Sequence, residues 1–207
     1  MIRRAAFGAG GLPLVTAAIT LVTALERIGV IPLRELASSP AVVEDGRVWL
    51  LATSAFVADR PVLPSIAGFL VVGLAVWALC GSRVLWTAAA GGHVLGTVSV
   101  YAALDAVSAA VGRPDFGTSA IIAAWIGVIA YRLHARGWGW AAVGLCAASA
   151  LVGWLLRPDL DVLDWEYAAA LAVGAATAAW LPRLRVAQMP TPLARWAVLL
   201  HGGLLRH

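Results

Sequence analysis

Gly117-Thr118-Ser119-Ala120 holds the hydroxyl with the clearest chemical context in the chain. It is a Gly-x-Ser followed by a small residue, at the start of a long apolar stretch. A serine nucleophile in such a place needs a base within hydrogen-bond reach and donors aimed at the oxyanion that forms on attack. Serine at a helix start or in a helix contact is also common, so the motif is compatible with catalysis and with packing.

Small residues continue along this stretch at spacings of three and four, at Gly117, Ala120, Ala124 and Gly127. Residues at these spacings share one face of a helix. In lipid, a stripe of small side chains lets a second helix backbone come close. We therefore expect a close helix contact beside Ser119.

His93 lies well inside another apolar stretch. An ionisable residue in a membrane segment is a candidate functional group, but a neutral histidine bonded to a neighbouring carbonyl or hydroxyl is the more common case. It lies nearer the opposite end of its predicted span, so we expect it to be too deep to serve Ser119.

Two carboxyl groups, Asp105 and Glu166, lie near the outer ends of apolar stretches. We expect a wet outer cavity to hold both, in a solvated or arginine-paired structural role rather than a binding role.

The acidic residues around Glu166 lack a glycine-centred calcium loop, and no phosphate-cradling or base-stacking motif occurs. The sequence therefore predicts no metal, no cofactor and no nucleic-acid partner.

Composition places the chain among integral membrane proteins. Of the 207 residues, 61% are hydrophobic, and the ten tryptophans fit the belts found at membrane interfaces. All 15 basic residues are arginine. Cys80 and Cys146 match no metal spacing, so we interpret both as packing residues.

Six apolar stretches come near the roughly 20 residues that cross hydrocarbon. A shorter apolar run, Val48 to Val57, is predicted to lie in the interface or to re-enter protein. Residues 1–182 are thus an all-α, six-helix membrane domain with an interfacial first loop, and residues 183–207 a basic tail with a short interfacial helix. The predicted spans are Ala5 to Leu25, Leu63 to Cys80, Leu85 to Val111, Gly117 to Leu133, Trp138 to Leu156 and Leu163 to Leu181.

Charge predicts the orientation. With the N-terminus in the cytoplasm, nine arginines and no acid lie on the cytoplasmic side, and six arginines and all 11 acids lie outside. The excess of arginine inside follows the positive-inside rule. We expect a multi-pass protein of the cell membrane with both termini cytoplasmic.

Two segments resemble the rhomboid intramembrane serine proteases, whose six-helix core carries a nucleophilic Gly-x-Ser-Gly at the start of the fourth helix. The first is Gly117-Thr118-Ser119-Ala120, with Ala124 and Gly127 following on the same face. The second is residues 46–56, similar to the first-loop pattern Gly-x-Trp-Trp-Arg-Leu-x-Thr-x-x-Phe. It retains Gly46, Trp49, Leu51, Thr53 and Phe56.

The resemblance also shows what this chain lacks. The family's oxyanion-stabilising His-x-x-x-Asn is replaced by the stretch Pro64 to Gly68, and Tyr167 stands at the position of the base histidine. Neutral tyrosine, with a pKa of about 10, does not deprotonate a serine at pH 7. Losing members of a serine catalytic unit costs roughly 10⁴ to 10⁶ in rate. The resemblance thus implies a rhomboid-like fold without proteolysis.

The leading expectation is a pseudoprotease whose former substrate cleft binds membrane lipid or transmembrane helices of other proteins. Ser119 and Tyr167 occupy the catalytic positions. The expected binding residues are Gly117, Thr118, Ala120, Pro64, Gly68, Trp49, Glu166 and Asp105. One alternative is an active intramembrane serine protease that uses Ser119. Another is a small-molecule transporter with a polar cavity around Asp105 and Glu166, although no inverted repeat supports it.

Overall fold

The structure is a computed structural model that describes the backbone of residues 2–106, 115–156 and 165–181 and the side chains of residues 11–103, 115–155 and 165–181. Helices make up its regular structure, and within these ranges no strand forms. An isolated antiparallel bridge joins Ser38 to Asp115. The predicted tail, residues 183–207, lies outside the described residues.

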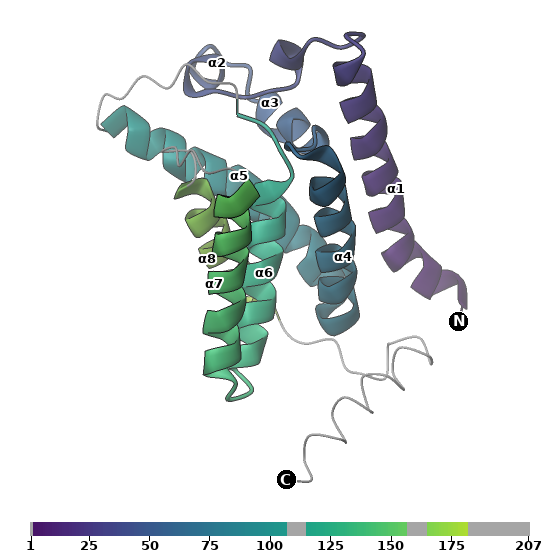
Figure 1. Cartoon of the computed structure of the whole chain (residues 1–207), viewed down its shortest axis with the longest axis vertical. Coiled ribbons are helices and arrows are strands. Elements are labelled where there is room, and N and C mark those ends of the chain that lie inside the picture. Colours follow the sequence, from purple (N-terminus) through teal and green to yellow (C-terminus); the bar gives the residue numbers. More distant parts are fainter. Residues whose placement is uncertain (1, 107–114, 157–164, 182–207) are drawn as a thin grey trace.

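Six long helices coincide with the six predicted stretches, so the all-α class is confirmed (Figure 1). Residues 107–111, the predicted end of the third stretch, lie outside the described ranges. The long helices are α1 Ile2–Arg27, α4 Val62–Cys80, α5 Ser82–Ala106, α6 Ser119–His134, α7 Gly139–Leu156 and α8 Trp165–Trp180.

Of the described helices, α4 is the one both long and apolar enough by itself to cross a membrane, with a mean hydropathy of 2.3. Two shorter apolar helices are α6 and the stretch Gly139–Leu155 of α7.

Glycine and proline set the helix boundaries. Pro61 precedes α4, where its fixed φ and missing N–H are tolerated, and Gly81 ends α4 with φ +85°. Gly137, also at φ +85°, lies in the tight turn between α6 and α7. Only glycine adopts this left-handed backbone without a steric penalty.

The first loop gathers at the end of the bundle opposite the N-terminus (Figure 1). It contains the short helices η1 Leu33–Glu35, α2 Pro40–Glu44, α3 Leu50–Thr53 and η2 Ser54–Phe56. Leu50, Ser54 and Val57 are buried, whereas Val48 and Trp49 are exposed. Val48 to Val57 was predicted to lie in the interface or to re-enter protein. One side of this stretch packs against the helix bundle, and the other side is exposed.

Trp125 of α6 lies at the centre of the core and is fully buried. Its ring packs against Phe69 of α4, with centroids 4.8 Å apart, and its indole N–H donates to the carbonyl of Leu85 on α5 at 2.9 Å. Gly73 makes room for the ring, because a Cβ there would lie 2.8 Å from Trp125 Cζ3. One aromatic side chain therefore joins α4, α5 and α6.

The small-residue stripe of α6 is a close helix contact, as predicted. Ala120 and Ala124 pack against Ala170 of α8. A Cβ on Gly127 would overlap the carbonyl of Leu171, and one on Gly174 would overlap the carbonyl of Ala124. The backbones of α6 and α8 therefore touch without side chains between them.

Candidate functional site

Ser119 is the first residue of α6, and a carboxylate holds its backbone N–H. The N–H donates to Asp59 Oδ2 at 3.1 Å. Asp59 comes from the first loop and is 8% exposed. A carboxylate is favourable here because the first turn of a helix presents unpaired N–H groups and the positive end of the helix dipole.

The same carboxylate leaves no room for a side chain at Gly117. Its φ is +136°, and a Cβ at this position would overlap the oxygens of Asp59. Its N–H donates to the carbonyl of Ser54 at 3.1 Å. The prediction that Gly117 belongs to the helix-contact stripe is therefore wrong. Glycine is needed at this position because its backbone is left-handed and because the Asp59 carboxylate lies close to its Cα.

Thr118 connects the start of α6 to the start of α4. It is fully buried, and its hydroxyl lies 2.9 Å from the hydroxyl of Ser65. Gly68, one turn farther along α4, faces Ile122 of α6, since a Cβ there would lie 3.5 Å from Ile122 Cδ1. Pro64 is exposed in the first turn of α4. This first part of α4 therefore supplies a hydroxyl contact and helix packing.

Asp59 is positioned by the buried residues that precede it. Val57 and Ala58 are fully buried. The Ala58 N–H donates to Thr23 Oγ1 of α1 at 2.8 Å, and Thr23 is itself buried. This hydrogen bond fixes the first loop to α1 at Ala58, one residue before Asp59.

The hydroxyl of Ser119 has no hydrogen-bond partner among the described residues, and the side chain is half-buried. Tyr167 is half-buried in the first turn of α8. No hydrogen bond joins it to Ser119 in the part of the chain that the structure describes. The catalytic positions assigned to the two side chains stay a prediction.

His93 lies on α5 and contacts a different serine. Its Nε2 is 3.1 Å from Ser54 Oγ in the first loop, and both side chains are buried. A neighbouring carbonyl or hydroxyl was predicted as the partner of His93, and the structure shows a hydroxyl. The contact fastens the first loop to the middle of α5.

Glu166 differs from the expectation of a solvated or arginine-paired carboxylate. It is 5% exposed, and its Oε1 contacts the hydroxyl of Thr97 on α5. The ion pairs formed among the described residues do not include it. The expectation fails because Glu166 lies on the face of α8 that also carries the buried Ala170 and Gly174. The side chain of Asp105 lies outside the described side chains.

Tyr101, two turns beyond His93 on α5, completes a polar stripe. Its hydroxyl lies 2.9 Å from Ser38 Oγ of the first loop and donates to Asp115 Oδ2 at 3.0 Å. The backbones of Ser38 and Asp115 exchange hydrogen bonds of 2.8 and 2.7 Å. The first loop therefore bonds to α5 and to the segment before α6 through buried polar groups.

Trp49 lies before α3 and is 58% exposed.

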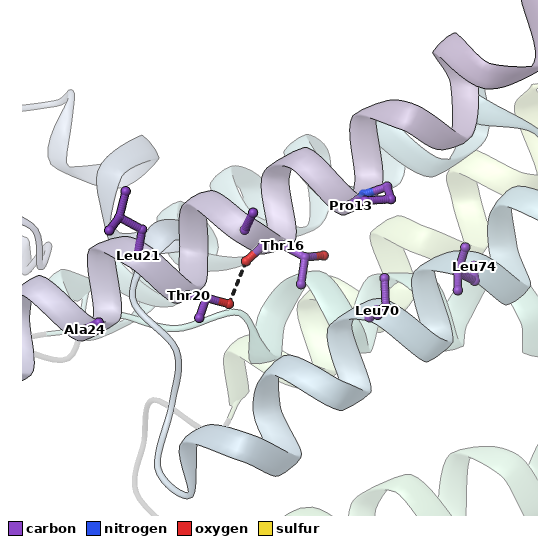
Figure 2. A pocket seen from close by; sticks show the side chains of 8 residues that line it. Pro13, Thr16, Thr20, Leu21, Ala24, Leu70 and Leu74 are labelled. Atoms are coloured by element: carbon purple, nitrogen blue, oxygen red, sulfur yellow. Dashed lines mark hydrogen bonds between the residues drawn. The ribbon is translucent and has the colours of Figure 1, made fainter.

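A groove of about 730 Å³ lies elsewhere, between α1 and α4 (Figure 2). Its lining is mostly apolar, and the hydroxyls of Thr16 and Thr20 bond back to carbonyls of their own helix. The residues predicted to line a cleft are not among those that line this groove.

Comparison with protein-family models, curated proteins and solved structures found no match to this chain. Among the described residues, no group of three or more His, Cys, Asp or Glu side chains could hold a metal ion.

The backbone N–H of Ser119 is engaged by the Asp59 carboxyl group. A backbone N–H at the nucleophile is a usual oxyanion donor, and here a carboxylate already accepts it. An oxyanion formed at this position would lie beside the carboxyl group of Asp59. Sequence reasoning missed Asp59. The sequence feature that could have indicated Asp59 is a carboxylate directly after the apolar run that ends in Val57 and Ala58.

Proposed function

We propose that this chain is a rhomboid-like pseudoprotease of the cell membrane, with six spans and both termini in the cytoplasm. It does not cleave peptide bonds. It binds a transmembrane helix of another protein, or a lipid, at the outer end of α6 and α8.

The contact between Asp59 and the Ser119 N–H carries the proposal. Catalysis requires donors that wait for developing negative charge. A carboxylate bound to such a donor opposes that charge and removes the donor. The glycine of the Gly-x-Ser motif is explained by the same contact, so the motif needs no catalytic role.

The exterior of the bundle supports a membrane location. Large apolar side chains are exposed along α7 and α8, including Trp140 at 90%, Trp180 at 89% and Leu155 at 64%. Apolar exposure on this scale is unusual for a soluble monomer and is expected for helices in hydrocarbon.

The packing of α6 against α8 supports binding at their outer end rather than between them. Their backbones touch at Gly127 and Gly174, which leaves no space for another helix at that level. Ser119 and Tyr167, at the starts of the two helices, are only half-buried. A ligand that reaches these two side chains does not have to separate the helices.

Photo-crosslinking at Ser119 and Tyr167 in intact cells tests binding. We expect adducts with a phospholipid or with transmembrane segments that mass spectrometry can identify. The matched control places the crosslinker at Trp140, whose side chain faces outward from α7. Adducts no different in identity or yield from those at Trp140 would refute binding at this site.

A fluorophosphonate probe tests the alternative of an active serine protease. The proposal expects no labelling that depends on Ser119. Labelling of the wild-type protein that Ser119→Ala abolishes would establish a reactive nucleophile and refute the pseudoprotease.

A further inference from the structure

Arg132, in the last turn of α6, carries a charge that the protein largely buries. The residue is 7% exposed, and neither ion pair among the described residues includes it. Its Nη2 donates to the carbonyl of Leu181, the residue after α8, at 3.3 Å. Its Nε is buried and has no hydrogen-bond partner in the described part of the chain. Because a guanidinium has five N–H donors and keeps its charge in proteins, one carbonyl does not satisfy it.

The Leu181 carbonyl supplies only part of the negative charge that Arg132 needs. The unpaired carbonyls at the C-terminal end of a helix together carry about half a negative charge. Since α8 ends at Trp180, its last carbonyls place this partial charge beside the guanidinium. An ion taken out of water is strongly unfavourable unless a full opposite charge pairs with it. About half of the arginine charge is therefore not compensated by α8.

The acids of this chain belong to the opposite end of the bundle. In the described ranges they lie in the first loop, next to it in α1, or at the first-loop ends of α5, α6 and α8 (Figure 1). Residues 157–164, which hold three more, connect the first-loop ends of α7 and α8. Residues 182–207 contain no Asp or Glu. A full negative charge beside Arg132 therefore has to come from another molecule.

The surface around this end of the bundle is basic and rich in tryptophan. Arg83, at the start of α5, and Arg136, in the turn after α6, are both exposed. Trp138, Trp140 and Trp180 are exposed at the same end. Tryptophan gathers at the level of lipid headgroups, and basic sites between transmembrane helices on the cytoplasmic side bind anionic headgroups. The surroundings of Arg132 thus favour a lipid phosphate as its counter-charge.

We propose that Arg132 forms a site for a phosphate group where α6 and α8 end, and that an anionic phospholipid supplies this group. The fork of a guanidinium matches two phosphate oxygens. Nε and the remaining N–H groups donate to the phosphate, while Nη2 keeps the Leu181 carbonyl. The lipid source rests on the membrane location proposed above, but the site does not depend on the absence of proteolysis.

The test is the unfolding midpoint of the full chain in detergent micelles with phosphatidylglycerol or with phosphatidylcholine. For the wild type, we expect phosphatidylglycerol to raise the midpoint by about 5 to 10 °C more when its concentration is about 100 times its Kd. Arg132→Gln should bind it about 10-fold or more weakly. The exposed Arg83→Gln removes the same charge and should respond like the wild type. Equal effects of the two lipids on the wild type, or equal responses of the wild type and Arg132→Gln, would overturn the proposal.

Arg132→Lys tests the fork even if Arg132→Gln does not fold. Lysine keeps the positive charge but cannot hold two phosphate oxygens in the same way, so we expect it to bind phosphatidylglycerol more weakly than the wild type. A full wild-type response of Arg132→Lys would overturn the site, because net charge alone would then explain the lipid preference.

Inorganic phosphate, added to the phosphatidylcholine micelles, tests the free anion as the source. We expect no rise in the midpoint, because the site takes its phosphate from a headgroup. A rise that Arg132→Gln abolishes would support the phosphate site and assign it to the free anion. No rise with either probe that depends on Arg132 would overturn the site and point to an acidic side chain of another protein. These measurements do not involve Ser119, so their failure would leave the pseudoprotease proposal standing.

Discussion

Asp59 accepts a hydrogen bond from the backbone N–H of Ser119 at 3.1 Å, across a sequence separation of 60 residues. This contact joins the first loop to the start of α6 and places a carboxylate where a serine hydrolase keeps a free donor. It is both an N-terminal cap of the helix and the reason that we propose no proteolysis.

Removal of this cap should destabilise the protein. Asp59→Ala leaves the half-buried N–H of Ser119 without its acceptor, and we expect a loss of about 1 to 2 kcal/mol in the free energy of unfolding. Asp59→Asn keeps an acceptor oxygen and should lose less. Denaturant titration in mixed micelles measures both variants. Asp45→Ala, at a carboxylate whose side chain is 72% exposed, is the control and should change little. A loss for Asp59→Ala no larger than for Asp45→Ala would contradict the capping role.

Gly117→Ala should be costly for two reasons. The left-handed φ of +136° strains any L-residue, and the new Cβ would overlap the Asp59 carboxylate. We expect a loss of about 2 kcal/mol or more. Gly144→Ala on α7, where nothing lies within 4 Å, should be neutral or stabilising by up to about 1 kcal/mol.

The double variant Gly117→Ala/Asp59→Ala distinguishes overlap from strain. If the overlap dominates, the two losses will not add, because Asp59→Ala removes the atoms that the new methyl group meets. Strict additivity would assign the whole cost to the backbone conformation.

The helices were predictable because their apolar stretches are long and their ends carry Gly, Pro or Arg. Ala120, Ala124 and Gly127 were also predictable as a contact, since three residues at helical spacing specify one face. Asp59 was not predictable, because its position depends on how a 34-residue connection between α1 and α4 folds back onto the bundle. The pairing of His93 with Ser54 was only partly predictable. A carbonyl or hydroxyl partner was expected, but which group it is depends on the same fold of the loop.

Gly174→Ala should separate α6 from α8. The added methyl group would overlap the carbonyl of Ala124, which is helix backbone and has little freedom to move. We expect a loss of about 2 to 4 kcal/mol in the free energy of unfolding. Gly153→Ala, on α7 with open space around it, is the matched control. If Gly174→Ala were as stable as Gly153→Ala, the backbone contact between the two helices would be wrong.

A double-mutant cycle tests the contact between Ser54 and His93. Ser54→Ala leaves the His93 Nε2 without its partner in a buried site, and we expect a loss of about 1 to 3 kcal/mol. His93→Leu removes the other partner, and the double variant should recover part of the summed losses. Ser99→Ala is the control, because that hydroxyl is exposed and bonds only to its own helix. A coupling energy near zero would show that the two side chains do not interact.

The most direct test of the central claim is a fluorophosphonate labelling experiment on the purified full chain in lipid vesicles. Wild type, Ser119→Ala and Asp59→Asn are compared, together with an active serine hydrolase as a positive control. We expect that neither the wild type nor Asp59→Asn is labelled above the level of Ser119→Ala, because among the described residues no hydrogen bond joins the Ser119 hydroxyl to a base. Labelling of the wild type that disappears in Ser119→Ala would show that Ser119 is a reactive nucleophile and that the protein is not a pseudoprotease.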